Sequence, residues 1–399
     1  MLYYNIAHYQ ITMRQNMKFK LLMKLFFVVI LLQKFAYAAD DAHDHDHSAH
    51  SEEKFYGHVG VRVHADHISD ANEGDEEVNE LYTHSHIEMG SRIAEGFNID
   101  TNLKIEGEPA GHSHGGVSRL HDGDSRIFED HPLLVESLTL TYSQEDFSIY
   151  AGKFNPKVGL NYHNFPGLYS YSMIEEYKIA ERIGLGANYS FNFNDFGTHK
   201  LDVSTFFADT TVLSQAILDS RTKVRKEDGG LANTEGLDSY AISFGGKDFY
   251  SLDNNLAERL SYRVGYALQK KGVTNDNDET RYSASLSYKE KFTSKVSKTL
   301  IFEYMDINHY NGEAGHDRSY FTSSLDLKLY PYNFTTTYTF IDNNAPGEEA
   351  EGADGKVLQI SVGYSISESL NVSFGFKRAD EELEVTERFG LGLKYNFEI

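Results

Sequence analysis

The sequence predicts an all-β protein, a transmembrane antiparallel β-barrel of about 16 strands with long external loops and short periplasmic turns. Three observations predict this class. Segments in which apolar and polar residues alternate recur along the chain, and the connections between them are alternately long and short. After the first 38 residues, no segment is apolar enough for a membrane-spanning helix. In such a barrel apolar side chains face lipid and polar side chains face a wet interior.

Residues 1–38 are expected to be a signal peptide. A lysine-rich stretch precedes the apolar run Leu25–Leu32, and the small-x-small sequence Ala36-Tyr37-Ala38 follows it. The run is far shorter than the ~20 residues of a spanning helix, so cleavage is favoured over a membrane anchor. The charged stretch is long, which leaves Met13 and Met17 as alternative start residues. The mature chain is therefore expected in the bacterial outer membrane.

The composition argues against several classes of protein. The chain has no cysteine, which excludes disulfides and thiolate metal sites. Its formal net charge of −23 disfavours a nucleic-acid partner. No serine lies in a nucleophile-elbow motif, so no enzyme is expected. The acidity lies mostly in the predicted loops, where carboxylates are free to bind cations.

The alternation has a period of two, which is typical of a strand with two different faces. In the last segment Phe389, Leu391 and Leu393 point one way, and Gly390 and Gly392 point the other. The predicted strands are 56–68, 80–93, 96–107, 133–143, 145–153, 183–193, 198–210, 236–248, 255–269, 279–289, 294–309, 316–329, 331–342, 356–365, 368–379 and 384–398. Boundaries carry an uncertainty of ~2–4 residues and the strand count is open by two. A barrel of this size encloses an aqueous lumen.

One local sequence carries a family resemblance. Ala151-Gly152-Lys153-Phe154-Asn155-Pro156-Lys157-Val158-Gly159-Leu160 resembles the Gly-Lys/Arg-Phe-x-Pro-Pro-Phe-Gly signature of the porin family that includes the phosphate-selective porins. Glu181-Arg182-Ile183-Gly184-Leu185-Gly186 is similar to the start of the following strand in that family. The resemblance implies a sixteen-stranded outer-membrane porin. Lys157-Val158 replaces the usual Pro-Phe, and the concentrated row of cations that a phosphate channel needs is not visible, so phosphate selectivity is not implied.

The longest predicted connection, residues 154–182, is the third external loop. In sixteen-stranded general porins this loop folds inward and narrows the pore, so the resemblance implies the same here. The predicted constriction residues are Lys157, His163, Glu175, Glu176, Lys178 and Arg182. The alternative is that these are ordinary charges of a solvated loop.

The predicted mature N-terminus, residues 39–54, alternates histidine with aspartate. Its candidate metal ligands are His43, His45, His47 and His50. Imidazole suits Zn, Cu and Ni, and carboxylates add negative charge. The segment cannot form a core, so we expect a disordered periplasmic tail.

A second histidine cluster lies in the predicted barrel. His64 belongs to the polar face of the first strand, and His84 and His86 belong to the polar face of the second. If this hairpin is symmetric about residue 74, His64 lies opposite His84, with Cβ atoms ~5 Å apart. The next long loop adds His112 and His114. A metal ion would need ligands from more than one strand, and the alternative is that these residues line a hydrated wall.

Three functions remain open from the sequence. The first is a porin-like channel for small hydrophilic solutes or ions, with selectivity for divalent metal or metal chelates left undecided. The second is a barrel that captures metal, and the third is a structural or adhesive barrel with a closed lumen. The expected partners are outer-membrane lipid and small solutes or metal ions. A homotrimer is left open. No cofactor is required, and binding of Zn, Cu or Ni is left open.

Overall fold

The computed structural model describes residues 54–69, 78–107, 125–129, 131–160, 165–218, 221–249, 259–346, 353–381 and 384–398. The predicted signal peptide, and all of the predicted tail except Lys54, lie outside these residues. Residues 52–396 form one compact unit, and a second unit, 1–51 with 397–399, is described only at Phe397 and Glu398.

Within the described ranges, none of the helices has both the length and the apolar character needed to cross a membrane.

The described chain is almost entirely β-structure. The strands are β1 (Phe55–Ser69), β2 (Val78–Ala94), β3 (Phe97–Glu106), β4 (Arg126–Ile127), β5 (Leu133–Gln144), β6 (Phe147–Phe154), β7 (Arg182–Asn192), β8 (Thr198–Ala208), β9 (Ser239–Lys247), β10 (Leu260–Gln269), β11 (Glu279–Thr293), β12 (Val296–Asn308), β13 (Asp317–Leu329), β14 (Tyr332–Asn344), β15 (Gly355–Ser365), β16 (Leu370–Glu381) and β17 (Glu384–Glu398). The helices are α2 (Ser170–Tyr177) and the 3-10 turns η5 (Asn194–Phe196), η6 (Val212–Ser214), η7 (Lys226–Asp228) and η9 (Tyr310–Gly312).

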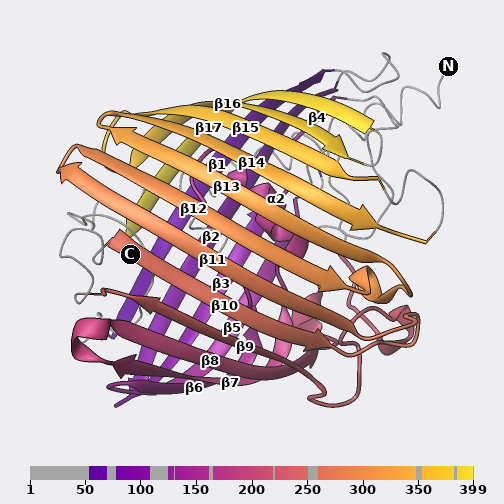
Figure 1. The fold of residues 1–399 in the computed structure, drawn as a ribbon. Helices are drawn as coiled ribbons and strands as arrows, with labels where there is room; N and C mark the ends of the chain where they lie inside the picture. Colours follow the sequence, from indigo (N-terminus) through magenta and orange to yellow (C-terminus); the bar gives the residue numbers. More distant parts are fainter. Residues whose placement is uncertain are drawn as a thin grey trace, which may run out of the picture. The chain divides into compact units, whose positions relative to one another are not determined.

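The long strands close into a ring (Figure 1). Each pairs antiparallel with the next along the chain, from β1 with β2 through to β16 with β17, and β17 also pairs with β1. The two-residue strand β4 stands outside this ring and pairs in parallel with β2 at Glu80 and Leu81. Closure leaves no unpaired sheet edge, so the backbone groups of the strands are satisfied within the ring.

The predicted strands are confirmed as a sixteen-stranded antiparallel barrel. Most ends agree within a few residues, although the strand predicted at 236–248 is shorter and covers Ser239–Lys247. β4 was not predicted, because two residues are too few to display a period. Arg126 in β4 forms an ion pair with Glu80 of β2, and this contact depends on the tertiary structure.

The barrel is apolar outside and polar inside. On β14, Phe334 and Tyr338 are 42% and 40% exposed, whereas the inward Thr335, Thr337 and Thr339 are at most 4% exposed. The same outward exposure recurs around the ring at Ile99, Leu140, Leu185, Val264, Leu286, Phe321, Ile360 and Leu391. Exposed apolar surface costs about 25 cal/mol per Å² in water, so this outer face is suited to a non-aqueous surrounding.

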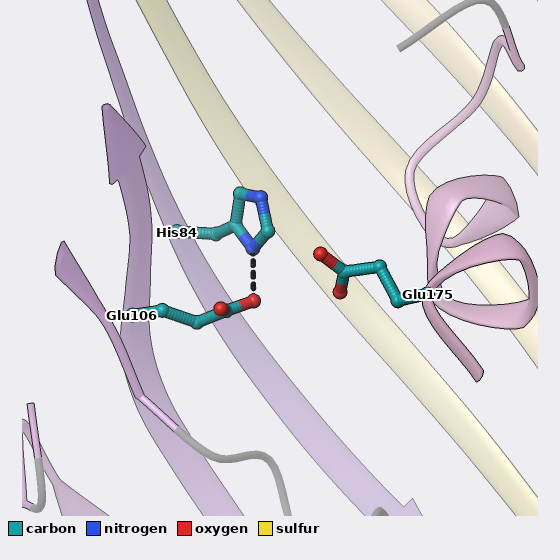
Figure 2. Close-up of side chains that lie close together, drawn as sticks. All are labelled: His84, Glu106 and Glu175. Atoms are coloured by element: carbon teal, nitrogen blue, oxygen red, sulfur yellow. Dashed lines mark ion pairs between the residues drawn. The ribbon is translucent and has the colours of Figure 1, made fainter. Parts of the chain in front are cut away.

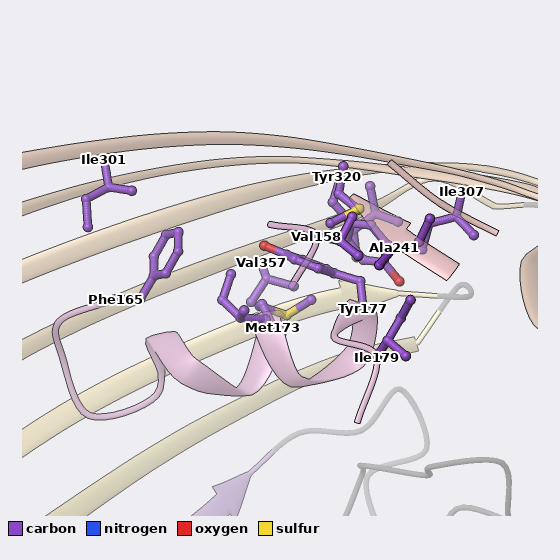
Figure 3. Close-up of a cluster of buried hydrophobic side chains, with 14 of the residues drawn as sticks. Val158, Phe165, Met173, Tyr177, Ile179, Ala241, Ile301, Ile307, Tyr320 and Val357 are labelled. Carbon is purple, nitrogen blue, oxygen red and sulfur yellow. The ribbon is translucent and has the colours of Figure 1, made fainter. Parts of the chain in front are cut away.

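One part of the inner wall is apolar, although most inward-facing residues of the barrel are polar. The inward positions of β12–β15 include Ile301, Met305, Ile307, Tyr320, Ile341 and Val357, and all are buried. Met173, Ile174 and Tyr177 of α2 belong to the same cluster (Figure 3). Burial of a large apolar side chain contributes ~1.5–3 kcal/mol, so these contacts hold α2 against β12–β15.

Candidate functional site

The candidate site is the connection between β6 and β7, residues 155–160 and 165–181, called the inward segment below. At β12, Glu303 accepts hydrogen bonds from the Leu160 amide at 2.6 Å and from the Tyr177 hydroxyl at 2.9 Å. At β11, Ser283 donates to the Val158 carbonyl at 2.8 Å. These contacts attach both ends of the segment to one side of the barrel.

The middle of the inward segment reaches the other side. The Tyr169 hydroxyl donates to Asp66 of β1 at 2.8 Å, and Lys104 of β3 donates to Glu175 of α2 at 3.0 Å. In the sixteen-membered ring β3 lies eight strands from β12, so the two strands face each other across the interior. The inward segment therefore crosses the lumen.

Two glycines on the inner wall make room for this crossing. A Cβ on Gly390 of β17 would lie 1.9 Å from the Tyr169 hydroxyl oxygen, and one on Gly375 of β16 would lie 2.8 Å from Leu168 Cδ2. Real Cβ atoms do not approach other atoms so closely. The Gly positions on the polar face of β16 and β17 thus let Leu168 and Tyr169 pack directly on the backbone of the wall.

One charge of α2, the Glu175 carboxylate, is held by the wall on the β3 side. Glu175 accepts hydrogen bonds from both Lys104 and Lys178, each at 3.0 Å, and Lys178 lies 3.5 Å from Glu136 of β5. Burial by itself would raise the pKa of Glu175, but Lys104 and Lys178 outweigh it and hold that pKa well below its ordinary value. Glu175 is therefore an ionised carboxylate inside the lumen.

The first residues of the segment bring a further cation into the lumen. Lys157 lies 3.3 Å from Asp202 of β8, and its side chain remains 48% exposed. Arg263 of β10 lies 3.7 Å from the same Asp202. An exposed ammonium at this point can meet a solute that passes the segment.

A buried ion-pair network anchors the end of the inward segment. Glu181 accepts two hydrogen bonds from Arg221, at 2.9 and 3.0 Å, and one from Lys153 at 2.8 Å. Lys153, which is completely buried, also lies 3.0 Å from Asp209. This network was not predicted from the sequence, because it joins a strand residue, Lys153, to two separate connections, and no local pattern links them. Glu181 lies between β6 and β7, and Asp209 and Arg221 lie between β8 and β9.

The predicted constriction residues fall into four groups. Lys157, Glu175 and Lys178 lie on the inward segment and pair with the wall or with each other. Glu176 interacts electrostatically with Arg318 and Lys377 of the facing wall. Arg182 belongs to the wall, since it begins β7 and donates to Gln269 at 2.9 Å. His163 lies outside the described residues.

The predicted pairing of His64 with His84 is wrong. β1 and β2 pair about residue 73, not 74, so His64 lies opposite Tyr82 and stacks on its ring at 5.0 Å. The hydrogen-bonded pairing of the two strands fixes the register, and the midpoint of the loop does not. When the centre of the hairpin shifts by one residue, each side chain stays on the same face of the sheet, but its cross-strand partner changes by two residues. His86 stacks on the ring of His58 at 5.5 Å.

One of the predicted histidines does lie in a potential metal site (Figure 2). His84 Nδ1 is 2.5 Å from Glu106 Oε1, and the ligand atoms of His84, Glu106 and Glu175 all lie within 4.8 Å of one another. The sequence contained a signal for Glu106, because the short turn after β2 places it opposite His84 in the β2–β3 ladder. No sequence signal placed Glu175 beside them. His43, His45, His47, His50, His112 and His114 lie outside the described residues.

The fold resembles solved outer-membrane proteins. The outer membrane channel DcaP of Acinetobacter baumannii matches with a TM-score of 0.50 and 12% identity over 86% of this chain and 96% of DcaP. OpdK of Pseudomonas aeruginosa matches with a TM-score of 0.49 and 8% identity, over 86% and 99%. A loop-deletion mutant of OmpT from Vibrio cholerae matches with a TM-score of 0.47 and 12% identity, over 86% of this chain and 98% of the mutant chain. At such low identity the likeness concerns the fold alone, and it does not single out the phosphate-selective porins.

In sequence, no family model and no curated protein matches the chain.

Proposed function

We propose that the protein is a bacterial outer-membrane channel for small hydrophilic solutes, and that the inward segment forms its constriction. The observation that carries the proposal is the attachment of this one segment to β3 and to β12 across a polar lumen. A segment in that position limits the free cross-section without closing the ring of strands. Aqueous passage then depends on what remains between the segment and the wall.

The outer face of the barrel supports a membrane location. Apolar side chains such as Leu286, Ile360 and Leu391 are 44–56% exposed, while Glu303 and Thr337 on the inner side are 1% exposed. Lipid covers such an outer face at no hydrophobic cost, and only a closed ring can satisfy the strand backbone there. Export through a cleaved signal peptide in residues 1–38 is part of this proposal.

The fold likeness adds to this support. DcaP, which has the same fold by a TM-score of 0.50, is described as an outer membrane channel. We transfer the class of function, a channel, and not a particular solute. The lumen bears both signs of charge. Lys157 and Arg263 both lie close to Asp202, and Glu175 is held by Lys104 and Lys178. A small polar or charged solute fits such a lumen better than an apolar one.

The direct test is reconstitution into planar lipid bilayers. The purified protein should insert and give discrete, ohmic current steps in potassium chloride. Heat-modifiable migration on gels provides an independent readout of the closed barrel. A protein that shows heat-modifiable migration and inserts into bilayers, but carries no current, would instead be a structural or adhesive barrel with a closed lumen.

A further inference from the structure

We propose that His84, Glu106 and Glu175 form a binding site for a divalent transition metal of the Zn²⁺ class, and that the bound ion fastens α2 to the wall of the barrel. The site lies at the contact between the inward segment and the β2–β3 hairpin. Its three side chains come from three different elements, β2, β3 and α2. An ion bound there would therefore join α2 to the paired strands β2 and β3.

The donors have the chemistry that Zn²⁺ prefers. Zn²⁺ binds imidazole nitrogen and carboxylate oxygen at about 2.0–2.2 Å, and three protein ligands with a water make a common four-coordinate site. Two carboxylates and one neutral imidazole match the charge of a divalent ion. The imidazole argues against Ca²⁺ and Mg²⁺, which take oxygen ligands.

The geometry requires only a small adjustment. Tetrahedral coordination at these bond lengths sets donor atoms about 3.3–3.5 Å apart. In the structure the donors of His84, Glu106 and Glu175 already lie within 4.8 Å of one another, and the closest pair is 2.5 Å apart. Side-chain rotation of Glu175 and a slight separation of His84 from Glu106 would bring the three to that spacing. The backbone can stay in place.

The pocket already binds a cation, the side chain of Lys104. Its ammonium contacts Glu106 and lies 3.0 Å from Glu175, so it bridges the two carboxylates that would bind the metal. A divalent ion with an additional imidazole ligand is a stronger counterion for two carboxylates than one ammonium. We infer that the metal replaces the Lys104 ammonium, whereas Lys178 keeps its contact with Glu136.

This exchange gives the proposal a distinctive test. Zn²⁺ affinity is measured by competition with a chromophoric chelator, using the full-length protein in detergent. In all variants His43, His45, His47, His50, His112 and His114 are replaced by Asn, because these residues could bind metal independently. The parent protein, which carries these six replacements and no other change, should bind one Zn²⁺ at this site. His84→Ala and Glu175→Gln should each weaken that binding by at least about a hundredfold, because each removes a direct ligand.

The variant Lys104→Met should have the opposite effect. It removes the competing cation, so the Zn²⁺ affinity should rise by about tenfold or more. The affinity of a Zn²⁺ site elsewhere in the protein should not change with this substitution. Matched controls are His64→Asn, another buried lumen histidine, and Glu176→Gln, the neighbouring acid on α2. Both should leave Zn²⁺ affinity unchanged. Heat-modifiable migration verifies that each variant forms a closed barrel.

Two results would overturn the proposal. One is a parent protein that binds no Zn²⁺ at micromolar concentration. The other is binding that survives both His84→Ala and Glu175→Gln. An effect of Zn²⁺ on pore current rests on the proposed channel function, but the binding measurement does not. If site-specific Zn²⁺ binding is found in a protein that carries no current, the metal site stands and the channel function fails.

Discussion

The hydroxyl group of Tyr177 on α2 donates a hydrogen bond of 2.9 Å to Glu303 on β12, across 126 residues of sequence. The same carboxylate accepts from the Leu160 amide, so Glu303 attaches the inward segment at two places. Glu303 is 1% exposed, so both contacts are made away from bulk water. This residue therefore has a large influence on how firmly the segment is held inside the lumen.

Glu303→Ala should loosen the inward segment. An unpaired buried donor costs about 1–3 kcal/mol, and this change removes the acceptor that the Leu160 amide and the Tyr177 hydroxyl share. We expect larger and noisier single-channel currents, measured in planar bilayers, with heat-modifiable migration unchanged. Glu303→Gln keeps an acceptor oxygen, so its single-channel current should lie between those of the wild type and Glu303→Ala. Identical currents for Ala and wild type would place the constriction elsewhere.

Because the chain has no cysteine, single introduced thiols can report which surfaces face water. Lys157→Cys should react with a charged, membrane-impermeant thiol reagent and reduce the current, since the Lys157 side chain is 48% exposed in the lumen. Phe334→Cys, on the outer face of β14, should not react with that reagent in lipid vesicles but should react after unfolding. Equal reactivity at both positions in the vesicles would contradict the assignment of faces.

Acid should weaken the anchor at Glu181. Burial would raise the pKa of this carboxyl, but Arg221 and Lys153 outweigh it and lower the pKa. A lowered folded-state pKa means that the stabilisation is present above the unfolded value of about 4.3 and is lost as pH falls through the folded value. Glu181→Gln should therefore destabilise the protein at pH 7, by about 1–3 kcal/mol, because buried Lys153 loses one charged partner and keeps Asp209.

The measurement for Glu181 is the urea unfolding midpoint at pH 7 and pH 3 for wild type and Glu181→Gln. The difference between the two proteins should shrink at the lower pH. Glu235→Gln is the control, since Glu235 pairs with Lys226 at an exposed position and exposed pairs contribute little. A Glu181→Gln effect of the same size at both pH values would show that its charge is not responsible.

Introducing a lysine should reduce the free energy of unfolding by different amounts on the two faces of a strand. Leu286→Lys puts a charge on the outer face of β11, where a lysine at the bilayer midplane costs about 2–4 kcal/mol. Ser287→Lys, one residue later, points to the lumen and should cost much less. Urea unfolding in lipid vesicles measures both. If Ser287→Lys is as destabilising as Leu286→Lys, the outer face is not in contact with lipid.

The sequence of β12 contains a signal for the inward segment. β12 carries apolar residues on both faces, with Phe302 and Tyr304 outward and Ile301 and Met305 inward. A water-filled lumen does not require apolar inward residues, so their presence indicates that something covers the inner wall. The sequence alone cannot identify α2 as that cover, because the match between the two apolar surfaces appears only after the chain has closed.

The sequence by itself determined the sixteen long strands to within a few residues, and the face on which each of their residues lies, but not β4. Those features follow from a period of two within each segment, as at Phe389, Leu391 and Leu393, and need no knowledge of the rest of the chain. The tertiary structure alone decided that His64 lies opposite Tyr82, that Lys104 and Glu303 hold the inward segment from facing walls, and that Glu175 lies beside His84 and Glu106. The reason is physical. The pattern of a strand is local, whereas contacts across a lumen depend on the register of the strand ladder and on the path of a long connection through the closed barrel.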